Sequence, residues 1–144
     1  MIDLVFLTQA FYNDHNQCKE ILHKDDRPHI QVTIKVSGLL FCIPLRSNIN
    51  HPNVLWTDKE NKYGLDFSKT VLITDSQRYI DDTRRPIIRQ SEFDSLRGKE
   101  YIIETALKKY IAKYRKAKSM MHISRHRLLV EYSTLQYFEK YILR

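Results

Sequence analysis

Residues 29–45 constrain the fold most, because they hold two runs of strand length around a two-residue turn. HIQVTIKV (29–36) alternates apolar and polar side chains, which predicts a strand with one buried and one solvated face. LLFCIPL (39–45) is almost continuously apolar, and Ser37-Gly38 between the runs suits a tight β-turn. The sequence therefore predicts an antiparallel hairpin whose solvated face carries His29, Gln31, Thr33 and Lys35.

Shorter elements are predicted on both sides of this hairpin. Thr8 can cap a helix over residues 9–23, which Pro28 separates from the hairpin. Residues 46–62 are polar and turn-rich, with Trp56 as an isolated anchor. The other strand candidates are residues 2–7, 63–67, 70–74, 77–80 and 86–89. Because none of the spacings accommodates a βαβ crossover, we expect a mainly antiparallel sheet.

From Ser91 onward the pattern has the period of helices. Ser91-Glu92-Phe93-Asp94 resembles a capping box that opens a short helix ended by Gly98. Longer helices are predicted over 99–117 and 125–142, each with an apolar stripe. The first stripe holds Ile102, Ile103, Ala106, Leu107, Tyr110, Ile111 and Tyr114; the second holds Leu128, Leu129, Tyr132, Leu135, Phe138 and Tyr141. The expected architecture is one α+β domain over residues 1–144 with a helical C-terminal half.

The net charge of +7 is concentrated in one segment of the chain. Residues 97–127 hold ten Lys or Arg against two acidic residues, whereas residues 1–96 hold twelve against thirteen. Such a local excess favours a polyanionic partner, of which RNA is the commonest in a cytoplasm; a merely solvated helix face is the alternative. The candidate RNA-binding residues are Lys35, Lys108, Lys109, Lys113, Arg115, Lys116, Lys118, Arg125 and Arg127.

Several classes of site are disfavoured by the sequence. The three glycines stand apart, so no glycine-rich loop is available to hold a nucleotide phosphate. The two cysteines and six histidines have no zinc-type spacing, and we expect neither a metal nor another cofactor. The first fifteen residues contain an apolar run too short for a signal peptide or a membrane span. The expectation is a cytoplasmic protein with no membrane partner.

The segment that follows the hairpin, RSNINH (46–51), brings together side chains suited to phosphate chemistry. RNA can be cleaved without a metal, because its 2′-hydroxyl attacks the neighbouring phosphate when it is aligned and deprotonated. Arg46 offers a rigid cationic fork for phosphate oxygens, and Ser47 and Asn48 can donate to the same oxyanion. His51, and His29 at the start of the paired strand, can transfer protons near neutral pH. The alternative is an ordinary polar turn.

The hairpin and its flanks, PHIQVTIKVSGLLFCIPLRS (28–47), resemble the endoribonuclease toxins of type III toxin–antitoxin systems. These are the ToxN/AbiQ-like proteins, and Arg-Ser-Asn after the second strand is most similar to their CptN/TenpN branch. The motif covers about 20 residues. Chain length, the early strand and helix, and the helical C-terminal half extend the resemblance loosely over the whole chain.

The resemblance implies a specific fold and activity. Such toxins have a strongly bent antiparallel sheet with surrounding helices, similar to the barrel core of the MazF/Kid toxins. They cleave RNA without a metal and leave 2′,3′-cyclic phosphate and 5′-hydroxyl ends. They process, and are inhibited by, a small antitoxin RNA made from tandem repeats. Toxin and RNA form cyclic assemblies, and the targets are cellular or phage RNA.

Aligned on the motif, the serine of the family falls on Ser47 and the preceding threonine on Arg46. The lysine at the start of the family hairpin falls on His29, which can also carry a proton and a positive charge. A tyrosine of the family falls on Asp25 and a further lysine on Ile49, and neither side chain can replace its counterpart. The general base and acid are therefore open between His29 and His51.

Two other functions are compatible with the same sequence. A non-catalytic RNA-binding module would use the basic segment 97–127 alone. A MazF-like toxin would be inhibited by a protein antitoxin instead of an RNA.

Overall fold

The computed structural model describes residues 2–22 and 28–143. Its strands are β1 (Asp3–Leu7), β2 (Gln31–Val36), β3 (Leu39–Arg46), β4 (Val54–Asp58), β5 (Tyr63–Asp66), β6 (Val71–Ile73) and β7 (Ile80–Asp81). They form one seven-stranded sheet in the order β4-β5-β3-β2-β1-β7, with β6 paired to β3 beside this path. Every pair of strands is antiparallel, which confirms the predicted α+β class and sheet type.

The hairpin of β2 and β3 lies at the centre of the sheet, as predicted. Its register runs from Gln31 opposite Pro44 to Val36 opposite Leu39. Ser37 and Gly38 both have positive φ, 53° and 78°, which is the backbone of a type I′ turn. The solvated face was predicted wrongly at one residue, because Gln31 is 4% exposed. Gln31 pairs with Val5 of β1 as well as with Pro44 of β3, so it lies inside the sheet and not at an edge.

Two strands, β3 and β1, pair with different neighbours along their length. β3 pairs with β6 through residues 40–42 and with β5 through residues 45–46. β1 pairs with β2 through residues 3–5 and with β7 through residues 6–7. The sheet nevertheless stays open between β4 and β7, so the barrel closure that the resemblance implied is not found.

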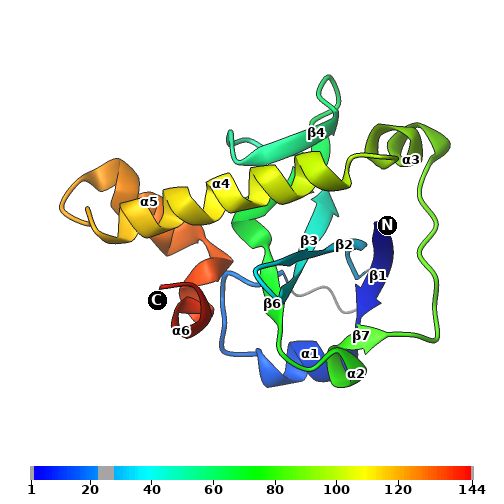
Figure 1. The fold of residues 1–144 in the computed structure, drawn as a ribbon, viewed down its shortest axis with the longest axis horizontal. Coiled ribbons are helices and arrows are strands. Elements are labelled where there is room, and N and C mark those ends of the chain that lie inside the picture. Colours follow the sequence, from blue (N-terminus) through cyan, green and yellow to red (C-terminus); the bar gives the residue numbers. More distant parts are fainter. Residues whose placement is uncertain (1, 23–27, 144) are drawn as a thin grey trace.

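The helices are α1 (Gln9–Asp14), α2 (Ser76–Tyr79), α3 (Gln90–Leu96), α4 (Glu100–Lys118), α5 (Ser124–Tyr132) and α6 (Glu139–Ile142), with 3-10 turns η1 (Phe67–Lys69) and η2 (Thr134–Tyr137). The long α4 runs across the sheet, with α3 near its start and α5 folded back beside its end (Figure 1). α1 and α2 lie together at the β7 end of the sheet (Figure 1). In the part of the chain described, no helix is long and apolar enough to cross a membrane.

The core lies between α4 and the sheet. The buried residues of α4 are Ile103, Leu107, Tyr110, Ile111, Tyr114 and Ala117, which recur with the helical period. They meet buried side chains of the hairpin, among them Val32, Phe41 and Ile43. The predicted α4 stripe is therefore confirmed except at Ile102, which is 45% exposed.

The first helix is shorter than predicted. Thr8 does cap it, accepting a hydrogen bond from the Phe11 amide, but it ends at Asp14. His15 terminates it by stacking on Phe11 and bonding the Phe11 carbonyl oxygen through Nδ1 at 2.6 Å. Asn13 and Asp14, in the last turn, also have a lower helix propensity than residues such as Ala, Leu or Glu. The end of the predicted helix at residue 23, and Asp25 at the position of the family tyrosine, lie outside the described residues.

The predicted last helix, 125–142, is broken into α5, η2 and α6. The break is at Ser133, whose hydroxyl accepts from the Leu135 amide at 3.2 Å and from the Tyr110 hydroxyl at 2.7 Å. Thr134 donates to the Thr70 carbonyl oxygen, so both side chains compete with helical hydrogen bonding. As a result Leu128 and Tyr132 of the predicted stripe are exposed, at 47% and 63%.

Four local predictions between residues 46 and 94 are also wrong, at least in part. Residues 46–62 were predicted as turns with Trp56 as an isolated anchor, but Trp56 belongs to the strand β4. Of the strand predicted over residues 77–80, residues 76–79 form the helix α2, capped by Asp75, and only Ile80 belongs to a strand, β7. The strand predicted over residues 86–89 is not found. Ser91 lies inside α3, which begins at Gln90 without a side-chain cap, although Gly98 does end this helix region with φ +71°.

We predict that Gly64→Ala destabilises the fold by about 1–3 kcal/mol, because overpacking forces neighbouring atoms apart. A Cβ at this position would lie 2.5 Å from the Leu55 carbonyl oxygen and 2.8 Å from Val54 Cγ2. Chemical denaturation measures the loss. Gly38→Asn is the matched control, because nothing lies within 4 Å of that position and Asn tolerates positive φ. Equal stability losses in the two variants would contradict the close approach of β4 to β5.

Candidate functional site

Three of the predicted site residues, His29, Arg46 and Ser47, line one open cleft at the end of the hairpin opposite its turn. The Leu45 amide donates to the Ile30 carbonyl oxygen at 2.8 Å, which sets His29 beside the end of β3. Tyr63 and Glu92 line the same cleft, whose volume is about 290 Å³. The hairpin register and the end of β3 thus bring together side chains 17 positions apart in the sequence.

Arg46 forms an ion pair with Asp66, a buried residue that was not among the predicted site residues. Its Nη1 donates to Asp66 Oδ2 at 2.6 Å, and the Asp66 side chain is fully buried. Asp66 Oδ1 accepts from the Ser68 hydroxyl at 2.6 Å and from the Ser68 amide at 3.0 Å. Arg46 pairs with Gly64 and so lies directly across from β5, the strand that ends in Asp66. This contact leaves 28% of the Arg46 side chain exposed.

His51 belongs to the same network and not to the cleft. Its Nε2 lies 3.0 Å from Asp66 Oδ1 and 3.2 Å from the Ser68 hydroxyl. Its Nδ1 accepts a hydrogen bond from the Asn53 amide at 3.1 Å. An acceptor cannot carry a proton, so this pattern assigns the proton of the neutral ring to Nε2. Both ring nitrogens of His51 are therefore occupied by the protein itself.

These contacts determine the charge of Asp66. Burial raises the pKa of its carboxyl group, but the hydrogen bonds from His51 and Ser68 and the contact with Arg46 outweigh it, and the pKa lies below its ordinary value. Asp66 is therefore an anion at neutral pH. It fixes one edge of the Arg46 guanidinium, and the remaining N–H groups of that fork are the ones available to the cleft.

A second arginine, Arg89, contacts two residues that line the cleft. The Arg89 guanidinium lies 4.5 Å from the centre of the Tyr63 ring and 2.5 Å from Glu92 Oε1. Glu92 raises the pKa of Arg89, so this cation persists at all physiological pH values. The cleft is thus lined by Arg46 and His29, and Arg89 lies behind two of its lining residues, Tyr63 and Glu92, with its charge balanced by Glu92.

A polar chain connects this region to the basic helix α4. Lys113 Nζ donates to Asn53 Oδ1 at 2.7 Å, and the Asn53 amide donates to His51. His51 in turn contacts Asp66, which holds Arg46. Lys113, one of the predicted RNA-binding residues, is therefore linked to the cleft through four consecutive contacts.

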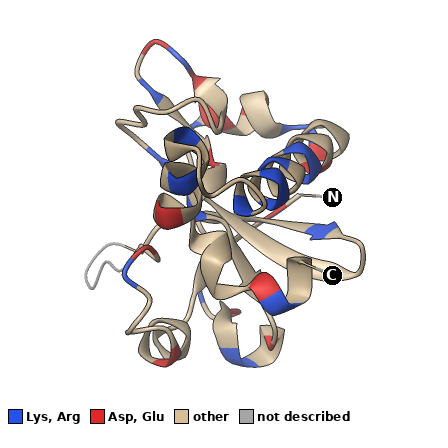
Figure 2. Ribbon diagram, turned by 90° about the vertical axis from the view of Figure 1, so that its left-hand side faces the viewer, with Lys and Arg blue, Asp and Glu red and all other residues tan. Residues whose placement is uncertain are grey.

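The other predicted RNA-binding residues are distributed over several faces. The helical positions of Lys109 and Lys116 place them on the same side of α4 as Lys113, and Figure 2 shows the succession of Lys and Arg along this helix. Arg125 of α5 is near this side, because Arg125, Lys113 and Lys116 all act on His126, whereas Arg127, two residues further on, points to a different side of α5. The pKa of His126 lies below its ordinary value, first because the ring is partly buried and then because the cations Arg125 and Lys116 are nearby. Lys108 and Arg115 line a separate pocket at the hairpin turn, and Lys118 pairs with Glu139 at 3.2 Å.

Two predicted residues lie apart from these groups. Lys35 borders a groove with Asp3, Glu100 and Glu104, so its surroundings are acidic. Asn48 is exposed, with φ 57°, and forms the turn after β3. Its carbonyl oxygen accepts from the Asn50 side chain at 3.1 Å. Neither residue lines the cleft.

Among the residues described, no group of three or more His, Cys, Asp or Glu side chains could hold a metal ion. Comparison with protein-family models, with curated proteins and with solved structures finds no match for this chain. The family resemblance of the hairpin therefore stays a prediction from its motif.

We predict that Asp66→Asn destabilises the protein by about 1–3 kcal/mol at pH 7, because it leaves the partly buried Arg46 cation without its anionic partner. Since the pKa of Asp66 is lowered by folding, its stabilising effect is complete above the ordinary carboxyl pKa and disappears as the pH falls through the lowered value. The stability difference between wild type and variant should therefore shrink below about pH 4. Urea denaturation at several pH values measures it.

Asp94→Asn is the control for this experiment. Asp94 accepts from Gln90 Nε2 at 2.9 Å on the exposed face of α3. Its neutralisation should change stability by no more than about 0.5 kcal/mol. A difference between wild type and Asp66→Asn that did not depend on pH would show that Asp66 is not an anion in the folded protein.

Proposed function

We propose that this protein is a metal-independent endoribonuclease, acting as the toxin of a type III toxin–antitoxin system. One observation carries the proposal: Ser47, which matches the serine of the family motif, lines a single open cleft with His29 and Arg46, which stand at the positions of the family lysine and threonine. Arg46 is additionally oriented by the buried Asp66 carboxylate at 2.6 Å. A preoriented guanidinium suits a phosphate whose negative charge increases in the transition state.

The proposed reaction is an internal transesterification of RNA. The scissile phosphate binds at the exposed edge of Arg46, and the Ser47 hydroxyl donates to one of its oxygens. His29 accepts the proton of the 2′-hydroxyl as that oxygen attacks the phosphorus and the bond to the 5′-oxygen breaks. The leaving 5′-oxygen takes a proton from a second acid, so that the products are a 2′,3′-cyclic phosphate and a 5′-hydroxyl.

The two histidine candidates differ in their surroundings. His51 uses both ring nitrogens within the protein, and accepting a substrate proton would require breaking its bond with the Asn53 amide. His29 lines the cleft itself. We therefore assign proton transfer to His29, and assign to His51 the role of positioning Asp66 and, through it, Arg46. Tyr63, whose phenol also borders the cleft, is a further candidate acid.

The antitoxin in this proposal is a small RNA processed from tandem repeats. The basic surface of Lys109, Lys113, Lys116 and Arg125 would hold its backbone, in cyclic protein–RNA assemblies. Lys35, Lys108, Arg115, Lys118 and Arg127 keep their predicted role as further contacts with RNA, and Asn48, predicted as a donor to the oxyanion, is proposed as a contact with substrate beside the cleft. A likeness of the bent sheet to the MazF/Kid toxins, a cytoplasmic location and a role in phage defence belong to the same proposal.

We predict that Ser47→Ala and His29→Ala each lower the rate of RNA cleavage by about 10²–10³-fold, the usual loss when one preorganised group is removed from the transition state. The wild-type protein is incubated with RNA in the presence of EDTA, and the product ends are tested for 2′,3′-cyclic phosphate and 5′-hydroxyl. His51→Ala should lower thermal stability together with activity, because it opens the Asp66 network.

Ser124→Ala and His122→Ala are the matched controls, because both residues are exposed and belong to the α4–α5 region, not to the cleft. They should cleave like wild type. Full activity of Ser47→Ala and His29→Ala, in protein that is folded, would refute the assigned roles.

A non-catalytic RNA-binding module is the second candidate. It is favoured by the fixation of Arg46 on Asp66, which removes part of the guanidinium from solvent and resembles a structural ion pair. This candidate predicts RNA binding that weakens steeply with salt and produces no new 5′-hydroxyl ends.

The DNA upstream of the coding sequence distinguishes the two types of antitoxin: tandem short repeats favour an RNA, and a small acidic reading frame favours a protein.

A further inference from the structure

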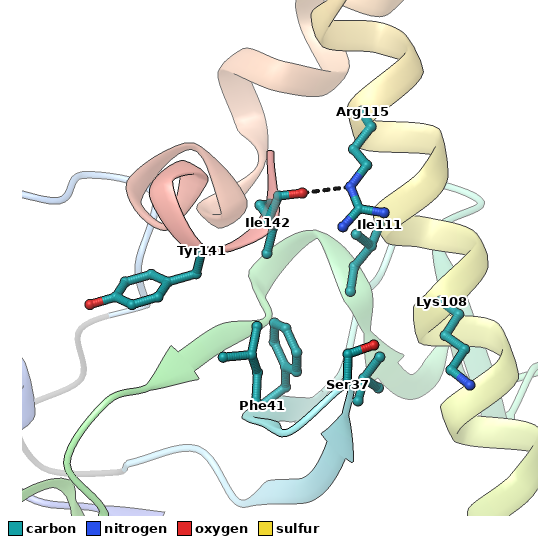
Figure 3. A pocket seen from close by; sticks show the side chains of 9 residues that line it. Ser37, Phe41, Lys108, Ile111, Arg115, Tyr141 and Ile142 are labelled. Atoms are coloured by element: carbon teal, nitrogen blue, oxygen red, sulfur yellow. Dashed lines mark hydrogen bonds between the residues drawn. The ribbon is translucent and has the colours of Figure 1, made fainter. Parts of the chain in front are cut away.

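A second pocket lies at the turn end of the hairpin, away from the cleft. It is formed by the hairpin turn, α4 and α6, and has a volume of about 570 Å³. Figure 3 shows Phe41 of β3, Ile111 of α4 and Ile142 of α6 grouped in it, with Lys108 and Arg115 projecting from α4. None of the residues that line the cleft lines this pocket. Its size lies in the usual range for small-molecule sites.

The inner wall of the pocket is apolar and rigid. Phe41, Ile111 and Ile142 are 1%, 5% and 1% exposed, so they belong to the core and hold fixed positions. Leu39, the first residue of β3, adds a partly exposed apolar side chain. Tyr141 is partly covered by Lys140, whose Nζ lies 5.0 Å from the centre of its ring. A flat, weakly polar group would therefore rest on aliphatic side chains here.

Two cationic side chains, Arg115 and Lys108, also line the pocket. Arg115 Nε donates to the Ile142 carbonyl oxygen at 2.5 Å, which orients the guanidinium while its terminal N–H groups face the pocket (Figure 3). Lys108 lies two helical turns earlier on the same side of α4, and 57% of its side chain is exposed. Its nearest acidic partner, Glu104, is 3.6 Å away, which is a loose contact at the surface. A ligand that fits must therefore be anionic as well as partly apolar.

We propose that this pocket binds one nucleoside phosphate unit, with the base against the apolar wall and the phosphate on the terminal N–H groups of Arg115. Lys108, which lines the same pocket and has a long, exposed side chain, turns from Glu104 toward the bound phosphate. An arginine fixed by a backbone carbonyl keeps a planar set of donors ready for phosphate oxygens. A base offers the flat face that Leu39 and Ile111 can cover. The inference goes beyond the proposed cleavage and does not depend on it, because the two sites share no residue.

The same chemistry has two sources, a free nucleotide and an unpaired nucleotide within an RNA strand. Binding of the four nucleoside 5′-monophosphates is measured by NMR chemical-shift perturbation, and binding of a labelled single-stranded RNA 8-mer by fluorescence anisotropy. Both assays use the full chain at low salt with EDTA.

Lys108→Gln should weaken binding about five- to tenfold, as expected for the loss of one charge-assisted hydrogen bond. Lys109→Gln is the matched control: it removes the same charge from the next residue, which does not line the pocket, and should leave mononucleotide binding unchanged. Leu39→Trp keeps every charge but fills the space for the base, and should abolish mononucleotide binding. Melting temperatures establish that each variant is folded.

If the pocket variants weaken mononucleotide binding alone, the ligand is a free nucleotide; if they weaken RNA binding as well, it is a nucleotide of an RNA strand. Equal mononucleotide binding by Lys108→Gln, Leu39→Trp and wild type would overturn the proposal, as would equal losses of mononucleotide binding in Lys108→Gln and Lys109→Gln. Ser47→Ala should keep its nucleotide binding, so a failure of the cleavage proposal and a failure of this one are separately visible.

Discussion

The open end of the hairpin depends on a single buried anion. Asp66 sits at the end of β5, caps η1 through the Ser68 amide, and holds Arg46 of β3 and His51 of the following loop. A carboxylate without these donors would not remain charged in the interior, because desolvation costs several kcal/mol per ion. The network therefore ties the charge of Asp66 to the correct pairing of β3 with β5. The position of the Arg46 guanidinium therefore depends on the pairing of β3 with β5, because this pairing brings Arg46 to Asp66.

The hairpin also separates two chemically different surfaces. At its open end, cationic and hydroxyl groups stand over a buried carboxylate, an arrangement for phosphate oxygens. At its turn end, the buried side chains of Phe41 and Ile111 form the floor of a pocket that Arg115 and Lys108 also line. Because both strands are rigidly paired over six residue pairs, the distance between the two ends is fixed. A flexible strand of RNA could reach both ends, whereas a free nucleotide would occupy one.

The sequence predicted what depends on local pattern and missed what depends on tertiary contacts. The hairpin, α4 and the antiparallel sheet follow from alternation, turn residues and helical period, and the cleft residues follow from the hairpin register. The break at Ser133 depends on the hydroxyl of Tyr110, which is distant in sequence. Asp66 could be recognised only from the pairing of β5 with β3, which local patterns do not encode. The early end of α1 depends on His15 stacking on Phe11, a contact that the apolar stripe did not indicate.

The basic residues of the segment 97–127 lie on more than one surface of the folded protein. On α4 the buried stripe divides the basic residues, so that Lys109, Lys113 and Lys116 lie on one side and Lys108 and Arg115 on the other. The first side continues onto α5 and reaches the cleft through Lys113 and Asn53. The second side faces the hairpin turn. The two sides are connected only across the exposed face of α4, opposite its buried stripe. If RNA is the partner, it must either cross over α4 or use the two sides in separate binding events.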